Sequence, residues 1–228
     1  EEVGGKVPVV AGIIANSTRE AILRARDIDD LNVDALQITP VHYLFKPSEE
    51  ATYQHFRTLA ESVKQPVIIY NVIPWNYLSP AQLIRIMREI PGVIGVKQSQ
   101  GDMKLMADLL LDVPEGKLVF SAVDALLYPS FALGSPGTIA ANPAAVPGVC
   151  VALWDAVQRG DHATAMEIHT RMLRFWNTIV GDNLPACVKY ALELQGCPVG
   201  LPRAPMPVAS EAQKAAIAPA LRHVLEME

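Results

Sequence analysis

One lysine in this sequence has a setting that suits covalent chemistry on a carbonyl group. Lys97 lies near the end of the apolar run Val93–Ser99. Desolvation in such a run disfavours the charged ammonium and favours the free amine, which can attack a carbonyl carbon and form an imine. A lysine that extends to solvent at the rim, or that pairs with Asp102, fits the strand position equally well. Lys97 is therefore a candidate nucleophile that needs a second residue to support it.

That second residue is a tyrosine at the end of the preceding apolar run. Tyr70 precedes Lys97 by 27 residues, which is the length of one strand-plus-helix repeat. Neighbouring parallel strands bring such side chains to the same end of the sheet. A phenol beside an amine can relay the protons that carbinolamine formation and collapse require, and a positioned acid-base contributes roughly 10²–10⁴-fold. Alone, Tyr70 would be read as a rim aromatic whose hydroxyl finds a backbone partner.

The elements that must position these two residues alternate along the chain. Short β-branched runs separated by amphipathic stretches predict a parallel sheet with helical crossovers. The predicted strands are Val7–Ile13, Ala35–Val41, Pro66–Val72, Val93–Ser99, Leu118–Val123 and Thr138–Asn142. Ser17, Ser48 and Ser79 are predicted helix N-caps, and Pro80 fits a first helical turn. Further helices are predicted over Val146–Arg159, His162–Val180, Leu184–Gln195 and Ser210–Glu228.

The spacing of the strands predicts a (β/α)8 barrel of the TIM type with a C-terminal helical appendage. Strand starts recur every 20 to 31 residues, the length of one barrel unit. Residues 1–145 would hold the third to eighth strands, and residues 146–228 the last barrel helix and the C-terminal helical region. The chain opens at Glu1-Glu2-Val3 with the pattern of a helix tail, so we expect two N-terminal units, on the order of 60 residues, to be absent from it. An open, doubly wound sheet of six strands is the alternative, although no Gly-rich phosphate loop supports it.

Composition excludes several classes of function. The 228 residues are 50% apolar and 19% charged, with a net charge of -5, which predicts one soluble domain and no nucleic-acid partner. No apolar stretch reaches the roughly 20 residues of a membrane span, and no signal peptide is recognisable, so we expect a cytoplasmic protein. Cys150, Cys187 and Cys197 form no CxxC pair, and His162 and His169 lie seven apart, so neither a disulfide framework, a metal nor a cofactor is expected.

Several motifs together carry a resemblance to a known family. They are Val9-Val10-Ala11-Gly12, Asn16-Ser17-Thr18-Arg19-Glu20-Ala21, Ile38-Thr39-Pro40, Tyr70-Asn71-Val72, Gly95-Val96-Lys97, and Gly134-Ser135-Pro136-Gly137-Thr138-Ile139 with Asn142. In their order and spacing they resemble the dihydrodipicolinate synthase / N-acetylneuraminate lyase family of pyruvate-type class I aldolases. The resemblance extends over essentially the whole chain.

The resemblance implies roles for particular residues. Lys97 would be the Schiff-base lysine, Tyr70 the phenolic proton relay and Ile139 a backbone contact near the substrate carboxylate. Tyr43 would be a second relay, with His42 as the alternative. In the family this second tyrosine crosses a dimer interface, so the resemblance implies a homo-oligomer, either a dimer or a tetramer. The Thr-Thr or Ser-Thr pair with which the family binds the carboxylate is absent from this chain.

Two departures from the family pattern bear on the substrate. Where synthases carry an arginine for the second substrate, this chain reads Ile73-Pro74-Trp75-Asn76-Tyr77, which offers no guanidinium fork for a carboxylate. Ser121-Ala122-Val123-Asp124-Ala125 lacks the glutamate of sialic-acid lyases. With Trp75, Asn76 and Ala122 near the pocket mouth, the aldehyde partner is expected to be less charged and more apolar. Alternatively, Trp75 and Phe45 pack a subunit interface.

The sequence thus predicts a Schiff-base-forming class I aldolase or lyase that acts on a 2-oxo acid and an aldehyde. Neither true dihydrodipicolinate synthesis nor sialic-acid cleavage is expected. A 2-oxo sugar-acid dehydratase of the same family is an alternative, and so is a non-catalytic relative that binds an oxo acid. Retention of both Lys97 and Tyr70 argues against a pure binding role.

Overall fold

The computed structural model describes residues 3–226, which form two compact units. The first unit holds residues 3–122 together with Leu133–Pro136, and the second holds Val123–Ala132 and the chain from Gly137 onward. The division at residue 145, which follows the sequence repeat, stays a prediction. Glu1 and Glu2 of the predicted helix tail lie outside the described residues, and the chain turns from Val3 to Lys6, whose N–H donates to the Val3 carbonyl at 3.1 Å.

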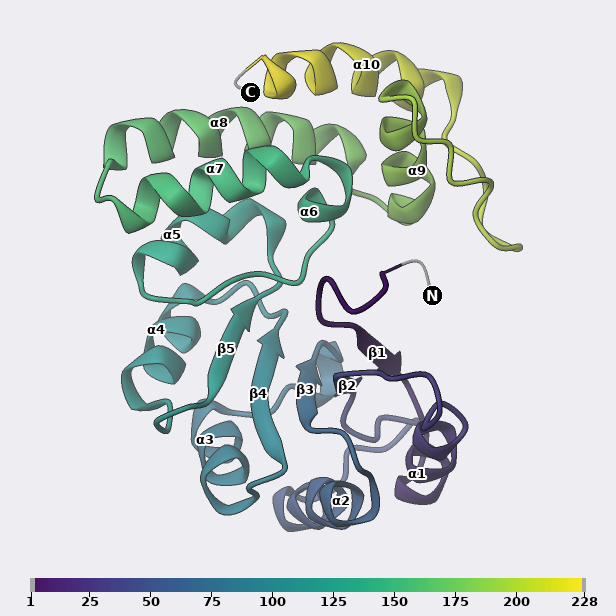
Figure 1. Cartoon of the computed structure of the whole chain (residues 1–228), viewed down its shortest axis with the longest axis vertical. Coiled ribbons are helices and arrows are strands. Elements are labelled where there is room, and N and C mark those ends of the chain that lie inside the picture. The colour runs from purple at the N-terminus through teal and green to yellow at the C-terminus, as the bar shows by residue number, and fades with distance from the viewer. Residues whose placement is uncertain (1–2, 227–228) are drawn as a thin grey trace. The chain divides into compact units, whose positions relative to one another are not determined.

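The first unit is built on a parallel sheet with helical crossovers. Its strands are β1 (Val10–Ile13), β2 (Ala35–Ile38), β3 (Val67–Asn71), β4 (Val93–Gln98) and β5 (Leu118–Ser121). Helices α1 (Thr18–Arg26), α2 (Glu49–Ser62), α3 (Pro80–Glu89) and α4 (Met103–Asp112) lie along one side of the curved sheet (Figure 1). The strand order β1-β2-β3-β4-β5 follows the sequence. A doubly wound sheet needs a reversal of strand order, so that alternative is wrong for the described strands.

One predicted strand is wrong, and the other five are shorter than predicted. Residues 138–142 form only an isolated bridge at Thr138, and a short helix, α6 (Asn142–Ala145), begins where the strand was expected. The carboxylate of Asp124 accepts the N–H groups of Ala141 at 3.2 Å and Asn142 at 2.5 Å, so these donors are not free for a sheet ladder. The first strand starts late because Pro8 has no N–H and the Val9 N–H donates to the Asp34 carboxylate at 2.7 Å.

The predicted helix starts in the first unit are confirmed. The hydroxyls of Ser17, Ser48 and Ser79 each accept a hydrogen bond from the backbone N–H three residues later. Each cap satisfies one of the donors that a helix N-terminus leaves open. Pro80 occupies the first turn of α3, where its missing N–H removes no helical hydrogen bond.

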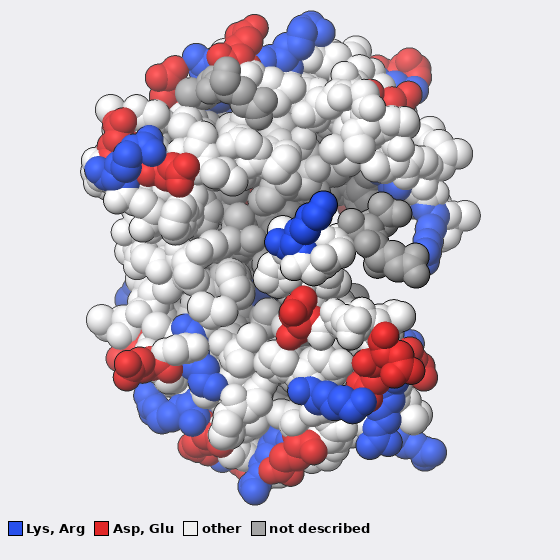
Figure 2. Space-filling model, viewed as in Figure 1, with Lys and Arg blue, Asp and Glu red and all other residues white. Residues whose placement is uncertain are grey.

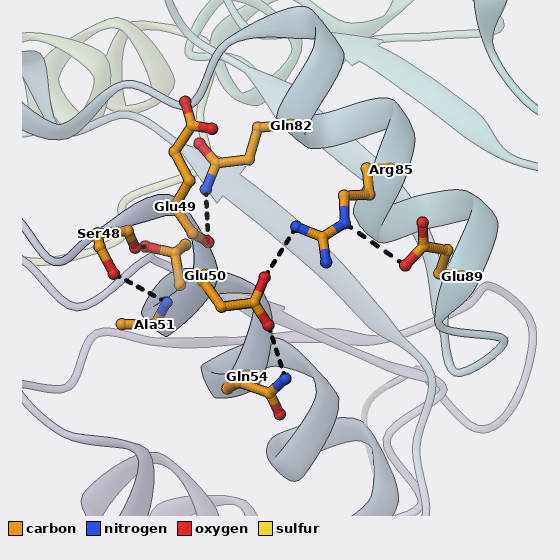
Figure 3. A network of polar contacts seen from close by, with 9 residues as sticks. Ser48, Glu49, Glu50, Ala51, Gln54, Gln82, Arg85 and Glu89 are labelled. Carbon is orange, nitrogen blue, oxygen red and sulfur yellow. Dashed lines mark hydrogen bonds and ion pairs between the residues drawn. The ribbon is translucent and has the colours of Figure 1, made fainter.

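Polar side chains tie α2 to α3 on the outside of the sheet (Figure 3). Arg85 forms ion pairs with Glu50 at 3.0 Å and Glu89 at 3.5 Å, and its guanidinium lies 4.2 Å from the ring centroid of Tyr53. The amide of Gln82 donates to the Glu49 carbonyl at 3.2 Å. Figure 2 shows acidic and basic side chains interspersed on the face in view. Such mixed surface charge stabilises helices modestly and gives no basic stripe for a phosphate backbone.

The second unit is helical in its described part. It contains η2 (Asp124–Leu126), α5 (Leu127–Ala132), α6, α7 (Pro147–Gln158), α8 (His162–Ile179), α9 (Leu184–Leu194) and α10 (Glu211–Leu225). Helix α8 packs against both α7 and α10 (Figure 1). The core of this unit includes Leu153, Met172, Phe175 and Leu221. The four C-terminal helices predicted from the sequence are therefore confirmed, up to the described end of the chain. None of the helices described between residues 3 and 226 is long and apolar enough to cross a membrane.

Candidate active site

The two residues predicted to do chemistry lie side by side near the carboxyl ends of neighbouring strands. Tyr70 on β3 and Lys97 on β4 are register partners. The Nζ atom of Lys97 lies 3.9 Å from the centroid of the Tyr70 ring, so the cation rests on the face of the phenol. Both side chains are half-buried. The carboxyl ends of parallel strands are where enzymes with this kind of sheet assemble their sites.

A bulge in β4 sets this pairing. Val67 pairs with Val93, but the next residue, Ile68, pairs with Gly95. Ile94 is therefore an extra residue that has no partner on β3. Without it, Tyr70 would pair with Val96, whose side chain points to the opposite face of the sheet because side chains alternate along a strand. The bulge thus brings the phenol and the amine to the same face.

Gly95 allows β4 to approach β5 closely beside the site. A methyl group at this position would collide with the carbonyl oxygen of Leu118 on β5. The close approach fixes the register in which Lys97 pairs with Phe120 and Gln98 with Ser121. Beyond the strand end, the N–H of Ala122 still donates to the Gln98 carbonyl at 3.0 Å. Lys97 is therefore held between two strands that continue past it.

The loop after β2 carries Tyr43, the predicted second relay. The Tyr43 side chain is 62% exposed, and the next residue, Leu44, has a positive φ of 56°. Among the described residues no contact joins Tyr43 to Tyr70 or Lys97. His42, the alternative relay, is half-buried and its Nδ1 lies 3.0 Å from the Pro40 carbonyl. The predicted role of Tyr43 therefore stays a prediction.

The side chains of Trp75 and Asn76 bind backbone carbonyls at the start of that loop. They lie in η1 (Pro74–Asn76), the turn that follows β3. The Trp75 indole donates to the His42 carbonyl at 3.0 Å, and the Asn76 amide donates to the Val41 carbonyl at 2.7 Å. Asn76 is fully buried, whereas Trp75 is 59% exposed. The described contacts of Asn76 are thus with the protein backbone.

The other predicted substrate contacts lie apart in the chain. Ala122 is half-buried and directly follows the carboxyl end of β5 in the first unit. Ile139 is half-buried in the second unit, in the segment that precedes α6. Their substrate contacts stay predictions.

Sequence reasoning missed two buried amides next to the candidate pair. Asn71 and Gln98 follow Tyr70 and Lys97 in sequence, and they are 0% and 1% exposed. The Asn71 amide donates to the Gln98 side-chain oxygen at 2.8 Å. The sequence could have indicated them, since both are polar amide residues at the ends of otherwise apolar strands. Such residues must find hydrogen-bond partners if the strand ends are buried.

Burial shifts the pKa of two groups outside the candidate pair. Burial raises the pKa of Tyr77, and the neighbouring Tyr70 raises it further. Burial and the nearby Asp124 carboxylate raise the pKa of the Cys150 thiol to about 12, which keeps that thiol protonated and unreactive. All three cysteines are free. In the described part of the chain no group of three or more His, Cys, Asp and Glu side chains is arranged to hold a metal ion.

An amine and a phenol in contact at the carboxyl ends of parallel strands fit the lysine-dependent class of carbonyl lyases. Comparison with known proteins places the chain within that class. Residues 1–224 match the model of the Dihydrodipicolinate synthetase family. The chain belongs to this family, whose members are carbon–carbon lyases of the aldolase type.

Individual relatives agree with this placement. The chain is 36% identical over 219 residues to a 4-hydroxy-tetrahydrodipicolinate synthase of Symbiobacterium thermophilum, which covers 95% of this chain and 74% of that protein. A crystal structure of a dihydrodipicolinate synthase matches with a TM-score of 0.86 and 30% identity, over 96% of this chain and 76% of that one. The prophage protein YagE of E. coli K12, solved in complex with pyruvate, matches with a TM-score of 0.88 and 25% identity, over 98% and 77%.

Proposed function

We propose that this protein is a Schiff-base-forming class I aldolase or lyase that acts on a 2-oxo acid of the pyruvate type. Lys97 is the nucleophile and Tyr70 the proton relay. The observation that carries the proposal is the position of the Lys97 amine, 3.9 Å from the Tyr70 ring centroid near the carboxyl ends of two adjacent strands. In this proposal the parallel sheet and its helices are part of a (β/α)8 barrel, as in the relatives that it matches.

Each step of the proposed reaction uses the amine, the phenol and water. The neutral Nζ of Lys97 attacks the 2-oxo carbon, and the former carbonyl oxygen takes a proton to give a carbinolamine. Loss of water gives a protonated imine, and removal of a C3 proton gives an enamine. The enamine carbon then bonds to the carbonyl carbon of an aldehyde, whose oxygen is protonated, and water hydrolyses the resulting imine to release the product and the free lysine. Cleavage follows the same steps in reverse.

Tyr70 is proposed to move the protons of these steps. The contact between its ring and the Lys97 amine supports this role. Proton transfer by a positioned acid-base supplies roughly 10²–10⁴-fold of the rate. Tyr43 is proposed as a second relay, and Ile139 as a backbone contact for the carboxylate. The bound pyruvate of the YagE structure supports a pyruvate-type donor.

The reaction is proposed to be neither true dihydrodipicolinate synthesis nor sialic-acid cleavage, although several relatives of this chain carry the synthase name. The stretch Ile73–Tyr77 stands where synthases carry an arginine, and the Trp75 indole N–H in it already donates to the His42 carbonyl. Neither Trp75 nor Asn76 can supply a guanidinium fork for a second carboxylate. The exposed faces of Trp75 and Phe45, 59% and 78% exposed, favour an apolar aldehyde. Alternatively, the same two residues pack between subunits of a homo-oligomer.

Trapping of the imine tests the lysine. The purified full-length protein is incubated with pyruvate and borohydride and then analysed by peptide mass spectrometry, with Lys97→Ala as the control. We expect a reduced pyruvyl adduct on Lys97 and none in the variant. A folded wild-type protein without an adduct would contradict the proposed mechanism and favour an oxo-acid-binding relative.

A panel of aldehydes tests the second substrate. The protein is assayed with pyruvate and either an aromatic aldehyde or an aldehyde that bears a carboxylate. We expect faster turnover with the aromatic aldehyde. Introducing the missing guanidinium by Trp75→Arg should shift the preference toward the carboxylate. Equal indifference of the wild-type protein to every apolar aldehyde would contradict this part of the proposal.

A further inference from the structure

A pair of buried amides lies directly beyond the candidate catalytic pair. Asn71 and Gln98 are register partners at the last positions of β3 and β4, one step past Tyr70 and Lys97. The Asn71 Nδ2 donates to Gln98 Oε1 at 2.8 Å, and both side chains are at least 99% buried. Because side chains alternate along a strand, these amides lie on the opposite face of the sheet from the phenol and the amine. They therefore fix the strand ends without occupying the site.

Asn71 also closes the turn that follows its own strand. Its Nδ2 donates to the Leu78 carbonyl at 3.2 Å, and its Oδ1 accepts the Leu78 N–H at 2.9 Å. The side-chain amide thus both donates to and accepts from the backbone of Leu78, seven positions later, as the backbone of a neighbouring strand would. With the bond to Gln98, one buried side chain makes three hydrogen bonds. Loss of this amide would leave three buried polar groups without their partner.

The turn closed by Asn71 is the turn that holds the second-tyrosine loop. Between Asn71 and Leu78 lies η1, whose Trp75 and Asn76 side chains bind the carbonyls of His42 and Val41. Two sets of hydrogen bonds, joined by the backbone of the turn between Asn76 and Leu78, thus link Gln98, next to Lys97, through Asn71 to the loop that carries Tyr43. Every residue in these hydrogen bonds belongs to the first unit.

We propose that Asn71 is a positioning residue, whose buried amide holds the Tyr70–Lys97 pair and the loop after β2 in the geometry that imine chemistry requires. This inference rests on the proposed function. Asn71 contacts neither member of the pair through its side chain, so its effect passes through the strand ends and through η1. A misplacement on the order of 1 Å in a reacting group can cost roughly 10²-fold in rate.

Two variants of Asn71 and one matched control test the proposal. Asn71→Leu keeps the side-chain size and removes all three hydrogen bonds. Asn71→Asp keeps the acceptor for the Leu78 N–H, and the Gln98 amide can turn its Nε2, which has no partner among the described residues, toward the new carboxylate. The control is Gln82→Leu, which removes another buried amide of the same unit that binds a backbone carbonyl between α2 and α3 (Figure 3).

Two rates are measured for each folded protein at saturating pyruvate. One is borohydride trapping of the imine on Lys97, and the other is exchange of the pyruvate methyl protons with D₂O, which requires the enamine. We expect Asn71→Leu to slow both by roughly 10–100-fold. We expect Asn71→Asp to recover part of that loss, and Gln82→Leu to lower the melting temperature while leaving both rates within about twofold of the wild type.

The outcomes separate this inference from the proposed function. Wild-type rates in folded Asn71→Leu, or equal losses in Asn71→Leu and Gln82→Leu, would overturn the positioning role and leave the lysine mechanism standing. A wild-type protein that forms no adduct on Lys97 would overturn the proposed function and the positioning role with it. If Asn71→Leu does not fold, Asn71→Asp decides, because wild-type rates in that variant would equally overturn the proposal.

Discussion

The two ends of strands β4 and β5 use a lysine in different ways. At the amino end, Lys117 precedes β5 and donates from its Nζ to the carbonyl oxygens of Val93 at 2.6 Å and Pro91 at 3.2 Å. Near the carboxyl end, the described contact of the Lys97 Nζ is the ring face of Tyr70. Burial lowers the pKa of Lys117, yet backbone acceptors engage its protons. A lowered pKa alone therefore does not single out a lysine for chemistry, and the neighbouring phenol is the observation on which the proposal for Lys97 rests.

This difference matches the general division of labour in barrel enzymes. Side chains at the amino ends of the strands serve stability, and those at the carboxyl ends serve chemistry. Lys117 binds the start of β4 to the start of β5, as a structural residue should. Lys97 contacts the ring of Tyr70, the residue proposed to relay protons. The same substitution can be made at Lys97 and at Lys117, so this difference between the two ends can be tested.

Conservative replacement of the two lysines should give the largest contrast. Lys97→Arg keeps a long basic side chain above Tyr70 but removes the primary amine, so we expect no borohydride-trapped adduct and a loss of turnover on the order of 10⁴–10⁶-fold. Lys117→Arg should leave adduct formation and turnover within about twofold of the wild type. Steady-state kinetics and peptide mass spectrometry measure both. Residual turnover of Lys97→Arg at the wild-type rate would abolish the distinction between the two ends.

Removal of the Tyr70 hydroxyl should test the chemical role of the carboxyl ends of the strands. Tyr70→Phe preserves the ring under Lys97 and loses only the proton relay, so we expect kcat to fall by roughly 10²–10⁴-fold while the adduct still forms slowly. Tyr53→Phe is the matched control, because Tyr53 also lies under a cation, with Arg85 4.2 Å from its ring centroid. An equal loss in the two variants would show that removing either hydroxyl has the same general effect, and would contradict a specific proton relay at Tyr70.

A buried histidine in the first unit has a pKa that links stability to pH. His55 on α2 is 6% exposed, its Nδ1 lies 2.9 Å from the Thr18 hydroxyl, and burial lowers its pKa to about 4. Because the pKa of His55 is lower in the folded state, the neutral side chain contributes stability that is fully present above the unfolded pKa of about 6.5. That contribution is lost as the pH falls toward 4.

When the pH falls from 7.5 to 4.5, we expect the protonation of His55 to lower the free energy of unfolding of the wild type by about 2–3 kcal/mol. Urea unfolding of the wild type and of His55→Gln at both pH values isolates this contribution, since the other titrating groups are common to both proteins. The exposed His223→Gln is the control and should follow the wild type. Parallel pH dependence of the wild type and His55→Gln would contradict the burial argument.

A methyl group added at Gly95, between the two ends of β4, should have the smallest effect on activity and stability. Gly95→Ala places a methyl against the Leu118 carbonyl, so we expect the unfolding free energy to fall by about 1–3 kcal/mol. Turnover should fall as well, because Lys97 lies two residues further along β4. Gly12→Ala in β1 is the control, since a methyl there meets nothing within 4 Å. Thermal unfolding and kinetics of both variants measure the effects, and an unperturbed Gly95→Ala would show that β4 and β5 can separate without cost.

The sequence by itself determined most of the elements and the two residues that are proposed as the chemical pair. The period of apolar runs places Tyr70 and Lys97 one strand-plus-helix repeat apart, which puts them on neighbouring parallel strands. Serine and proline at helix starts act through local backbone donors, so they could be read directly from the sequence. The predicted strand at residues 138–142 failed for the opposite reason, because the Asp124 carboxylate that binds its N–H groups lies far away in sequence.

Tertiary structure alone decided how the pair meets. Strand register depends on long-range pairing, and the bulge at Ile94 that aligns Tyr70 with Lys97 leaves no mark in the apolar pattern of β4. The partners of Asn71, Trp75 and Asn76 are backbone atoms of other segments, which no local pattern specifies. Residue types thus fixed which chemistry is available, whereas long-range hydrogen bonds fixed the geometry in which it can occur.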